Sequence, residues 1–189
     1  ALIENVTFNP VASGQAILIN ASGVNLDLGC GSLTQGNSQS GVSGVKVASS
    51  LNNVTIAHGR ISNFTQAGIE ISSNVTNPNI SGVILTNNLR GVYYNGSAGQ
   101  PITQSNMSDI EIVQSTTAVD CNYVNYSMIS NIIALNSSAA AFDVKNSYTN
   151  IFANVSVAGV RNSVDDAFGI SLRSGANNTI KYSAIDSIQ

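Results

Sequence analysis

Short apolar runs alternate with polar residues along this chain, and Gly, Asn, Ser and Thr separate one run from the next. The clearest example is residues 51–71, where Val54 and Ile56 precede a bend region and Ile69 and Ile71 follow it. This alternation has the period of a strand with one buried face, and clusters of Gly and Asn mark bends. The pattern therefore predicts short β-strands joined by tight turns.

Versions of this unit recur along the whole chain at intervals of roughly 22 to 28 residues. Residues 24–33 match residues 52–61 at an offset of 28, which aligns Leu26 with Val54 and leaves the Gly residues in register. A period of this length without a helical segment is typical of a solenoid. Three short strands per repeat, each paired with its copy in the next repeat, predict an all-β fold. We expect a single parallel β-helix of about six to seven turns over residues 1–189.

Alignment of the repeats places equivalent residues in columns, with copies about 4.8 Å apart. Tyr94 falls in an inward column, so its hydroxyl needs either a hydrogen-bond partner or a position at the edge of the core. Asn63 and Asn87 fall at bends, where we expect a left-handed backbone and a ladder of side-chain amides. The first predicted inward column contains Val45, Ile69, Val92, Val119, Phe142 and Ile170, and the second contains Val47, Ile71, Tyr94, Cys121, Val144 and Leu172.

An outward column between these two carries the candidate chemistry. Its members are Lys46, Glu70, Tyr93, Asp120, Asp143 and Ser171. Asp120 and Asp143 would lie on adjacent turns about 5 Å apart, where two carboxylates repel unless one is protonated or a cation lies between them. A spacing of about 5 to 5.5 Å is also that of a retaining glycosidase pair.

Three interpretations of this column stay open. Glu70, Asp120 and Asp143 are candidate catalytic residues of a polysaccharide-active enzyme. Alternatively, Tyr93, Asp120 and Asp143 form a binding site for a glycan or for Ca²⁺, the one cofactor that the column suggests. The third interpretation treats the column as ordinary solvated surface residues.

Composition excludes several function classes. Charged residues make up 9% of the chain, against about 25% in a typical soluble domain. The net charge of −3 and the pI near 4.8 leave no basic face for nucleic acid or anionic lipid. No apolar run approaches the roughly 18 residues of a membrane span, so we expect no membrane insertion.

The two cysteines, Cys30 and Cys121, are predicted to be small buried hydrophobic residues several turns apart, without a disulfide or a metal-ligand spacing. His58, the only histidine, aligns with Cys30 and is interpreted as an outward surface residue beside Arg60. About twelve Asn-x-Ser/Thr motifs are ascribed to the Asn- and Ser-rich composition rather than to glycosylation.

A cluster near the last full repeat alternates in charge. Arg161, Asp165, Asp166 and Arg173 are predicted to form a small salt-linked loop. Beyond Asn178 no capping pattern is visible, and an uncapped turn would expose strand edges and apolar residues. We therefore expect either a longer protein or end-to-end stacking of copies into oligomers.

The repeat resembles that of the right-handed parallel β-helix proteins of the pectate-lyase-like superfamily. Residues 24–33 look like the first full turn of that group, and Asn53-Val-Thr-Ile56 and Gly68-Ile-Glu-Ile71 look like its generic repeat. The resemblance covers essentially the whole chain and implies a right-handed β-helix. It does not imply one activity, because this architecture carries lyases, hydrolases, epimerases, phage tailspikes, adhesins and proteins without chemistry.

The catalytic motifs of this superfamily are not matched in order. Its polygalacturonate hydrolases carry Asn-Thr-Asp, Asp-Asp, Gly-His-Gly and Arg-Ile-Lys in that order. In this chain the nearest matches, Ala57-His58-Gly59-Arg60 and then Asp165-Asp166, occur in reverse. The acidic calcium ligands and arginine base of pectate lyases have no clear counterpart either.

We therefore favour a non-catalytic β-helix that serves as a scaffold, adhesive or fibre-forming module outside the cell or on a cell or virion surface. The alternatives are a polysaccharide hydrolase or lyase, and a glycan-binding module without turnover.

Overall fold

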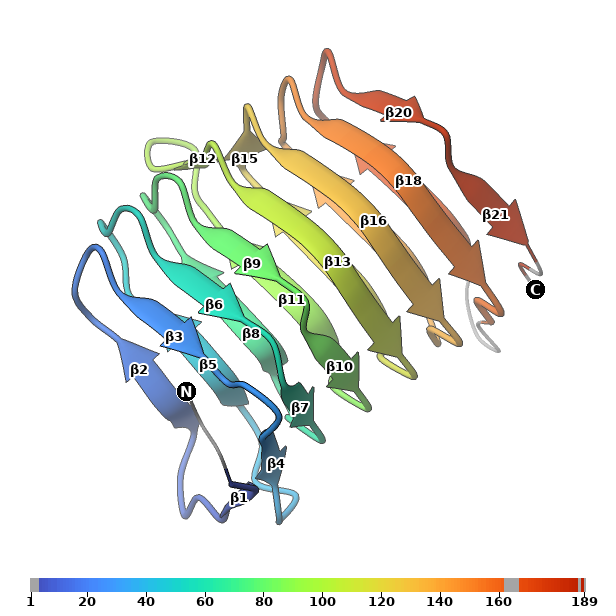
Figure 1. Cartoon of the computed structure of the whole chain (residues 1–189). Helices are drawn as coiled ribbons and strands as arrows, with labels where there is room; N and C mark the ends of the chain where they lie inside the picture. Colours follow the sequence, from blue (N-terminus) through green and yellow to red (C-terminus); the bar gives the residue numbers. More distant parts are fainter. Residues whose placement is uncertain (1–3, 162–166, 187, 189) are drawn as a thin grey trace.

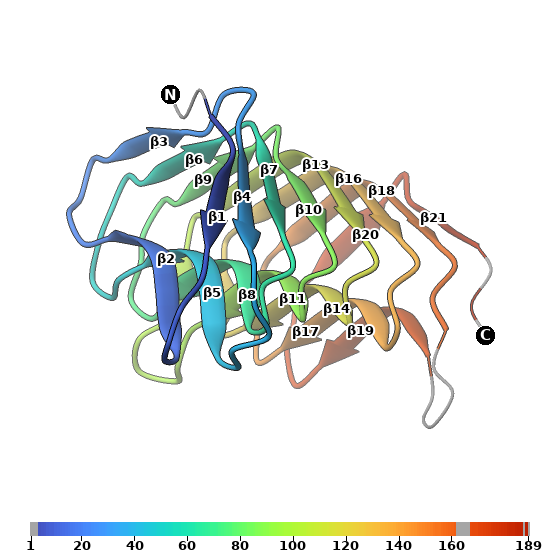
Figure 2. The same ribbon diagram turned by 90° about the horizontal axis from the view of Figure 1, so that it is seen from below.

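The chain winds into a right-handed parallel β-helix of about seven turns, which confirms the predicted fold class (Figure 1). The structure is a computed structural model that describes residues 4–161, 167–186 and 188. Its strands stack along a single axis, from β1 and β2 near the N-terminus to β19, β20 and β21 in the last described turn (Figure 2).

Each turn contributes one strand to a seven-stranded parallel sheet. Along the axis these strands are β2 (Gly14–Ile19), β5 (Val42–Val47), β8 (Ala67–Ser72), β11 (Arg90–Asn95), β14 (Thr117–Asn122), β17 (Ala140–Lys145) and β19 (Phe168–Arg173).

A twelve-stranded parallel sheet forms the other side. Its strands are β1 (Val6–Phe8), β3 (Asn25–Asp27), β4 (Ser32–Gln35), β6 (Thr55–Ala57), β7 (Arg60–Ser62), β9 (Asn79–Ser81), β10 (Ile84–Thr86), β13 (Asn106–Val113), β16 (Met128–Leu135), β18 (Ile151–Ala158), β20 (Thr179–Lys181) and β21 (Ala184–Asp186). Two short strands, β12 (Ile102–Thr103) and β15 (Val124–Asn125), pair beside it.

The predicted three strands per turn occur in the first turns, where two short strands of the large sheet follow each strand of the small one. A residue with positive φ separates the two, for example His58 at 57° between β6 and β7. In the fourth turn they fuse into the eight-residue strand β13, which keeps a positive φ of 57° at Asp109. The bend therefore persists where the strands join.

Both predicted inward columns are confirmed residue by residue. Val92, for example, pairs with Ile69 on one side and with Val119 on the other. Tyr94 is fully buried, and its hydroxyl lies 2.8 Å from the Ser105 Oγ, so its polar group is satisfied inside the core. The columns become exposed only in the last described turn.

The predicted alignment of the first two turns is wrong over part of its length. Leu26 pairs with Ile56, an offset of 30, and the offset of 28 begins only at Ser32, which pairs with Arg60. Two extra residues occupy the turn after β3. There the Asp27 Oδ1 accepts a 2.8 Å hydrogen bond from the Gly29 amide, and Gly29 has a φ of 58° that favours glycine.

This longer turn also corrects one cysteine. Cys30 lies exposed on the turn, neither buried nor stacked on His58, whereas Cys121 is buried as predicted. Both thiols are free.

The bends have the predicted backbone. Asn63 and Asn87 have φ values of 66° and 54°, in the left-handed region that asparagine tolerates. The amide ladder forms at other bends instead, for example from the Asn77 Nδ2 to the Asn53 Oδ1 at 2.8 Å.

Candidate functional site

The outward column of the seven-stranded sheet contains the candidate residues, and its predicted register is confirmed. Lys46 pairs with Glu70, Glu70 with Tyr93, Tyr93 with Asp120, and Asp120 with Asp143. The repeat unit causes this alignment, because each residue occupies the same position of its strand. Five successive turns therefore bring these side chains together.

Glu70 is enclosed rather than solvated. Its side chain is 3% exposed, and its Oε1 forms an ion pair with the Lys46 Nζ at 2.9 Å. The Ser43 Oγ donates to Oε2 at 2.7 Å, and the Gln66 Nε2 donates to the same atom at 3.4 Å. Both carboxylate oxygens of Glu70 are therefore occupied by side chains of this chain.

Asp120 is likewise buried, at 6% exposure. Its Oδ2 accepts a 2.8 Å hydrogen bond from the Arg90 Nε, and its Oδ1 lies 3.7 Å from the Lys145 Nζ. The Arg90 guanidinium also lies over the Tyr93 ring, 4.5 Å from its centroid. Burial raises the pKa of the half-buried Tyr93 hydroxyl, so the ring remains neutral. The interpretation of this column as ordinary solvated surface is wrong for Glu70 and Asp120.

Asp143 has the most cationic surroundings of the three carboxylates. The Lys145 Nζ lies 2.6 Å from its Oδ2, and the Arg173 Nη2 contacts both carboxylate oxygens at 2.6 and 2.7 Å. Burial raises the pKa of Asp143, but the hydrogen bonds from Lys145 and Arg173 outweigh it and hold the pKa below its ordinary value. Lys145 is thus the cation between Asp120 and Asp143 that their proximity requires.

Ion pairs therefore link neighbouring turns in two groups, one between β5 and β8 and one from β11 to β19, and no ion pair among the described residues joins the two groups. We define the ion-pair ladder as the residues of both groups: Lys46, Glu70, Arg90, Asp120, Lys145, Asp143 and Arg173. Sequence reasoning missed Arg90 and Lys145 because it followed one outward column. The period of two in a strand would have found Lys145, which lies two residues after Asp143 on the same face.

The lowered pKa of Asp143 predicts an acid-dependent loss of stability. Because its folded-state pKa lies below its unfolded value, the ion pairs stabilise the fold above about pH 4, and this contribution is lost as the pH falls through the folded pKa. Asp143→Asn should therefore lose less stability between about pH 4 and pH 2 than the unchanged chain, as measured by urea unfolding.

A matched control is Asp109→Asn, which removes an exposed carboxylate that forms no ion pair with a described residue. Its acid profile should follow that of the unchanged chain. If the stability of Asp143→Asn fell as steeply between about pH 4 and pH 2 as that of the unchanged chain, the lowered pKa of Asp143 would not be the cause of the acid sensitivity.

The remaining sequence candidates lie apart from this column. His58 is exposed, as predicted, and its Nδ1 lies 3.0 Å from the Asp27 Oδ1. Hydrogen bonds from His58 and Gly29 lower the pKa of Asp27. The salt-linked loop predicted around Asp165 and Asp166 lies outside the described residues.

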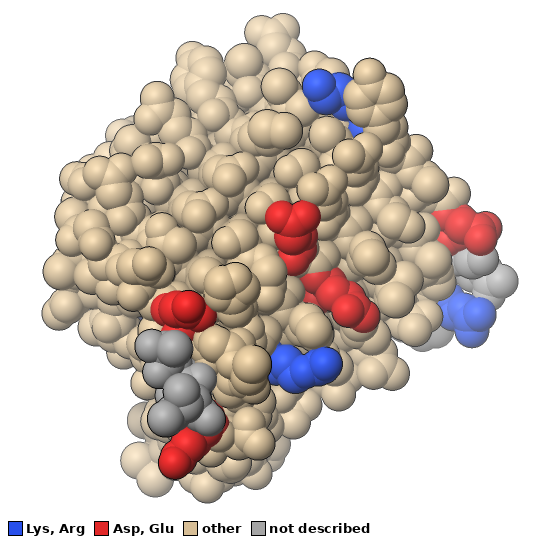
Figure 3. Space-filling view, viewed as in Figure 1, with Lys and Arg blue, Asp and Glu red and all other residues tan. Residues whose placement is uncertain are grey.

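Metal sites and membrane-spanning helices were also sought among the described residues. Among these residues, no three or more His, Cys, Asp or Glu side chains are grouped to hold a metal ion. They also include no helix of the length and apolarity that crossing a membrane requires. The face of the twelve-stranded sheet carries only scattered charged residues (Figure 3).

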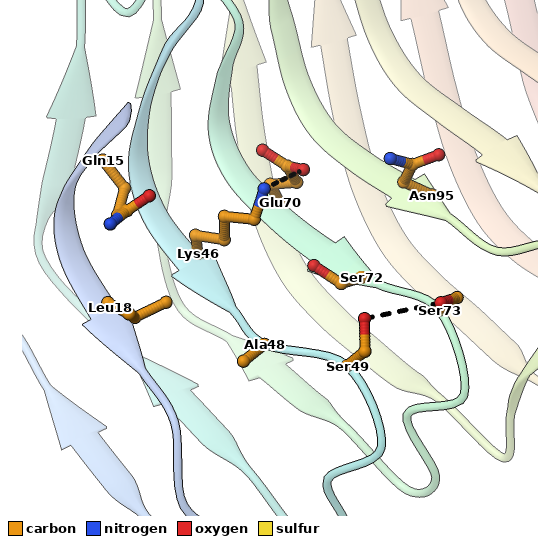
Figure 4. Close-up of a pocket in the computed structure, with 9 residues that line it drawn as sticks. All are labelled: Gln15, Leu18, Lys46, Ala48, Ser49, Glu70, Ser72, Ser73 and Asn95. Atoms are coloured by element: carbon orange, nitrogen blue, oxygen red, sulfur yellow. Dashed lines mark hydrogen bonds and ion pairs between the residues drawn. The ribbon is translucent and has the colours of Figure 1, made fainter. Parts of the chain in front are cut away.

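A polar hollow lies beside the start of the ion-pair ladder, on the outer face of β2, β5, β8 and β11 (Figure 4). Its volume is about 410 Å³. Lys46 and Glu70 contribute to its lining together with small residues such as Ala48 and Ser72. The hollow forms because long side chains (Lys46 and Glu70) lie next to short ones (Ala48 and Ser72) on the sheet surface. No sequence motif indicates such a difference in side-chain length.

No model of a known protein family matches the chain, and no curated protein matches it. Among solved structures, the chain is similar to the enzymatically active domain of tailspike protein 2 of bacteriophage CBA120. The TM-score is 0.61 at 14% sequence identity, and the match covers 96% of this chain and 33% of that one. The chain thus spans about a third of the length of that tailspike domain. The likeness supports the fold: the chain is a right-handed parallel β-helix.

Proposed function

We propose that this chain is a non-catalytic β-helical module that serves as a rigid scaffold or fibre segment outside the cell or on a virion surface. The observation that carries the proposal is the ion-pair ladder. Each of the three carboxylates that could have served catalysis, Glu70, Asp120 and Asp143, is held by a lysine or arginine of this chain.

This arrangement argues against glycoside hydrolysis at the column. A hydrolase needs one carboxylic acid with a raised pKa and a second carboxylate that is free to meet the sugar or a water. Asp143 has a lowered pKa, and Lys145 contacts both Asp143 and Asp120. The two carboxylates are therefore suited to linking turns.

The surface location rests on the structural similarity. The bacteriophage domain that the chain resembles belongs to a tailspike and is described as enzymatically active. Because the sequence identity is only 14%, we infer from this similarity a location on a virion or cell surface, and we infer no enzymatic activity. The low content of charged residues, which are scattered over the face in Figure 3, fits a structural element that recruits no nucleic acid.

A polysaccharide panel tests the proposal. The purified chain is incubated with neutral and acidic polysaccharides, and new reducing ends and unsaturated products are measured. We expect no product above the buffer blank. Cleavage that Asp120→Asn and Asp143→Asn each abolish without unfolding the chain would contradict the scaffold role. It would show that the chain is a polysaccharide-active enzyme.

The partner that we propose for such a module is another copy of this chain, stacked end to end. The last described turn exposes apolar side chains of three strands, among them Leu172, Ile180 and Ile185. Stacking would cover these side chains and pair the strand edges. Sedimentation velocity should show species larger than one chain that dissociate on Ile185→Lys. A single monomeric species at all concentrations would contradict stacking.

A further inference from the structure

We propose that the polar hollow across β2, β5, β8 and β11 is a binding site for a neutral saccharide. The inference goes beyond the scaffold role, and it requires no turnover.

The shape of the hollow follows from two neighbouring outward rows of the sheet. One row carries the long side chains of Lys46 and Glu70, and the next carries the short ones of Ala48 and Ser72. The step between the rows leaves a depression that is open to solvent (Figure 4). Its volume of about 410 Å³ lies in the range of roughly 300 to 1,000 Å³ of small-molecule sites.

The charge of the hollow selects a neutral ligand. Among the described residues, its only charged lining residues are Lys46 and Glu70, and they pair with each other at 2.9 Å. A ligand carboxylate would compete with Glu70 for an ammonium group that is already engaged. A neutral ligand can instead accept hydrogen bonds from the ammonium protons that Glu70 does not use.

The hydrogen-bonding groups of the hollow point to a ligand rich in hydroxyl groups. The side chains of Gln15, Ser72 and Asn95 line it and form no hydrogen bond with another described residue. Ser72 is only 9% exposed, so its unpartnered hydroxyl faces the hollow rather than open solvent. Amides and hydroxyls both donate and accept, which matches the donor and acceptor character of sugar hydroxyls.

An apolar element completes the match. Leu18 lines the hollow and is 48% exposed, which offers a contact for the C–H face of a sugar ring. No aromatic side chain in the described part of the chain lines the hollow. We therefore expect weak binding of a single ring, with a dissociation constant of about 1 to 10 mM.

The test is a titration of the ¹⁵N-labelled chain followed by amide chemical shifts. The probes are D-glucose, D-galactose and N-acetyl-D-glucosamine, with D-galacturonate as the acidic comparison. At least one neutral sugar should give saturable shifts centred on Lys46, Ser72 and Asn95. D-galacturonate should bind at least about threefold more weakly than that sugar.

Matched variants assign the effect to the hollow. The double variant Ser72→Ala/Asn95→Ala should weaken binding at least tenfold. Asn122→Ala is the control, because Asn122 pairs with Asn95 on the next turn but does not line the hollow. It should change binding less than twofold. Amide-shift dispersion establishes that both variants remain folded.

Three results would overturn the site: no saturable shift with any of the three neutral sugars, tighter binding of D-galacturonate, or unchanged binding by the folded double variant. None of them affects the scaffold proposal, which the polysaccharide panel tests through product formation.

Discussion

Phe142→Ala is expected to lower the free energy of unfolding by about 3 to 5 kcal/mol. Phe142 is fully buried in the first inward column, between Val119 and Ile170 on the adjacent turns. Its ring also packs edge to face against Phe152, with the centroids 6.0 Å apart. Alanine would leave a cavity that the stacked backbone cannot close, because both neighbouring turns hold it in register.

Urea unfolding followed by circular dichroism measures this effect. The control is Ile133→Ala, which truncates an apolar side chain that is 46% exposed on the twelve-stranded sheet. We expect a change within about 0.5 kcal/mol for this variant. Equal losses for the two variants would show that the inward column is not the main source of stability.

Lys46→Met is expected to lower the free energy of unfolding by about 2 to 4 kcal/mol, because it leaves Glu70 buried without its ion-pair partner. Two hydrogen bonds, from Ser43 and Gln66, would remain on the carboxylate. The double variant Lys46→Met/Glu70→Gln should recover most of the loss, since no charge is then buried. Lys181→Met, which removes a lysine of an exposed segment, should be nearly neutral.

A double-mutant cycle on the two positions gives the coupling energy directly. If the double variant were as unstable as Lys46→Met alone, the buried charge of Glu70 would not be the cause. The apolar stem of Lys46 would then account for the loss.

The sequence predicted the columns well because a strand has a period of two and each turn repeats it. Tyr93, Asp120 and Asp143 align in the structure as they do in the repeat. It failed where a turn changed length: the two residues added near Gly29 shifted the pairing of Leu26, and no periodicity reports such an insertion.

The bends account for half of the twelve Asn-x-Ser/Thr motifs, since six of their asparagines have a positive φ. At Asn53 the asparagine takes the positive φ, Val54 turns inward, and Thr55 begins the outward face of a strand. The same order recurs from Asn154 to Ser156. At these bends the motif follows from the backbone geometry, and the other six motifs remain ascribed to composition.

The chemistry of the site could not be predicted to the same depth. Alignment of the turns predicted the positions of the carboxylates. It could not predict which of them form ion pairs, because that depends on the conformations of the long Lys and Arg side chains nearby. Arg90 reaches Asp120 on the following turn, and Arg173 reaches back to Asp143. Such diagonal contacts depend on rotamers, which no repeat pattern encodes.

Each strand ladder joins a turn only to the turn before it and the turn after it, and this has a consequence for how the molecule opens. Cooperativity in such a stack is carried by nearest neighbours, so partial unfolding starts at an end and advances turn by turn. The amides of β19, β20 and β21 should consequently exchange with solvent sooner than those of β8 and β11, which have a neighbouring turn on both sides. The turns at the ends of the stack therefore open first, and the central turns open last.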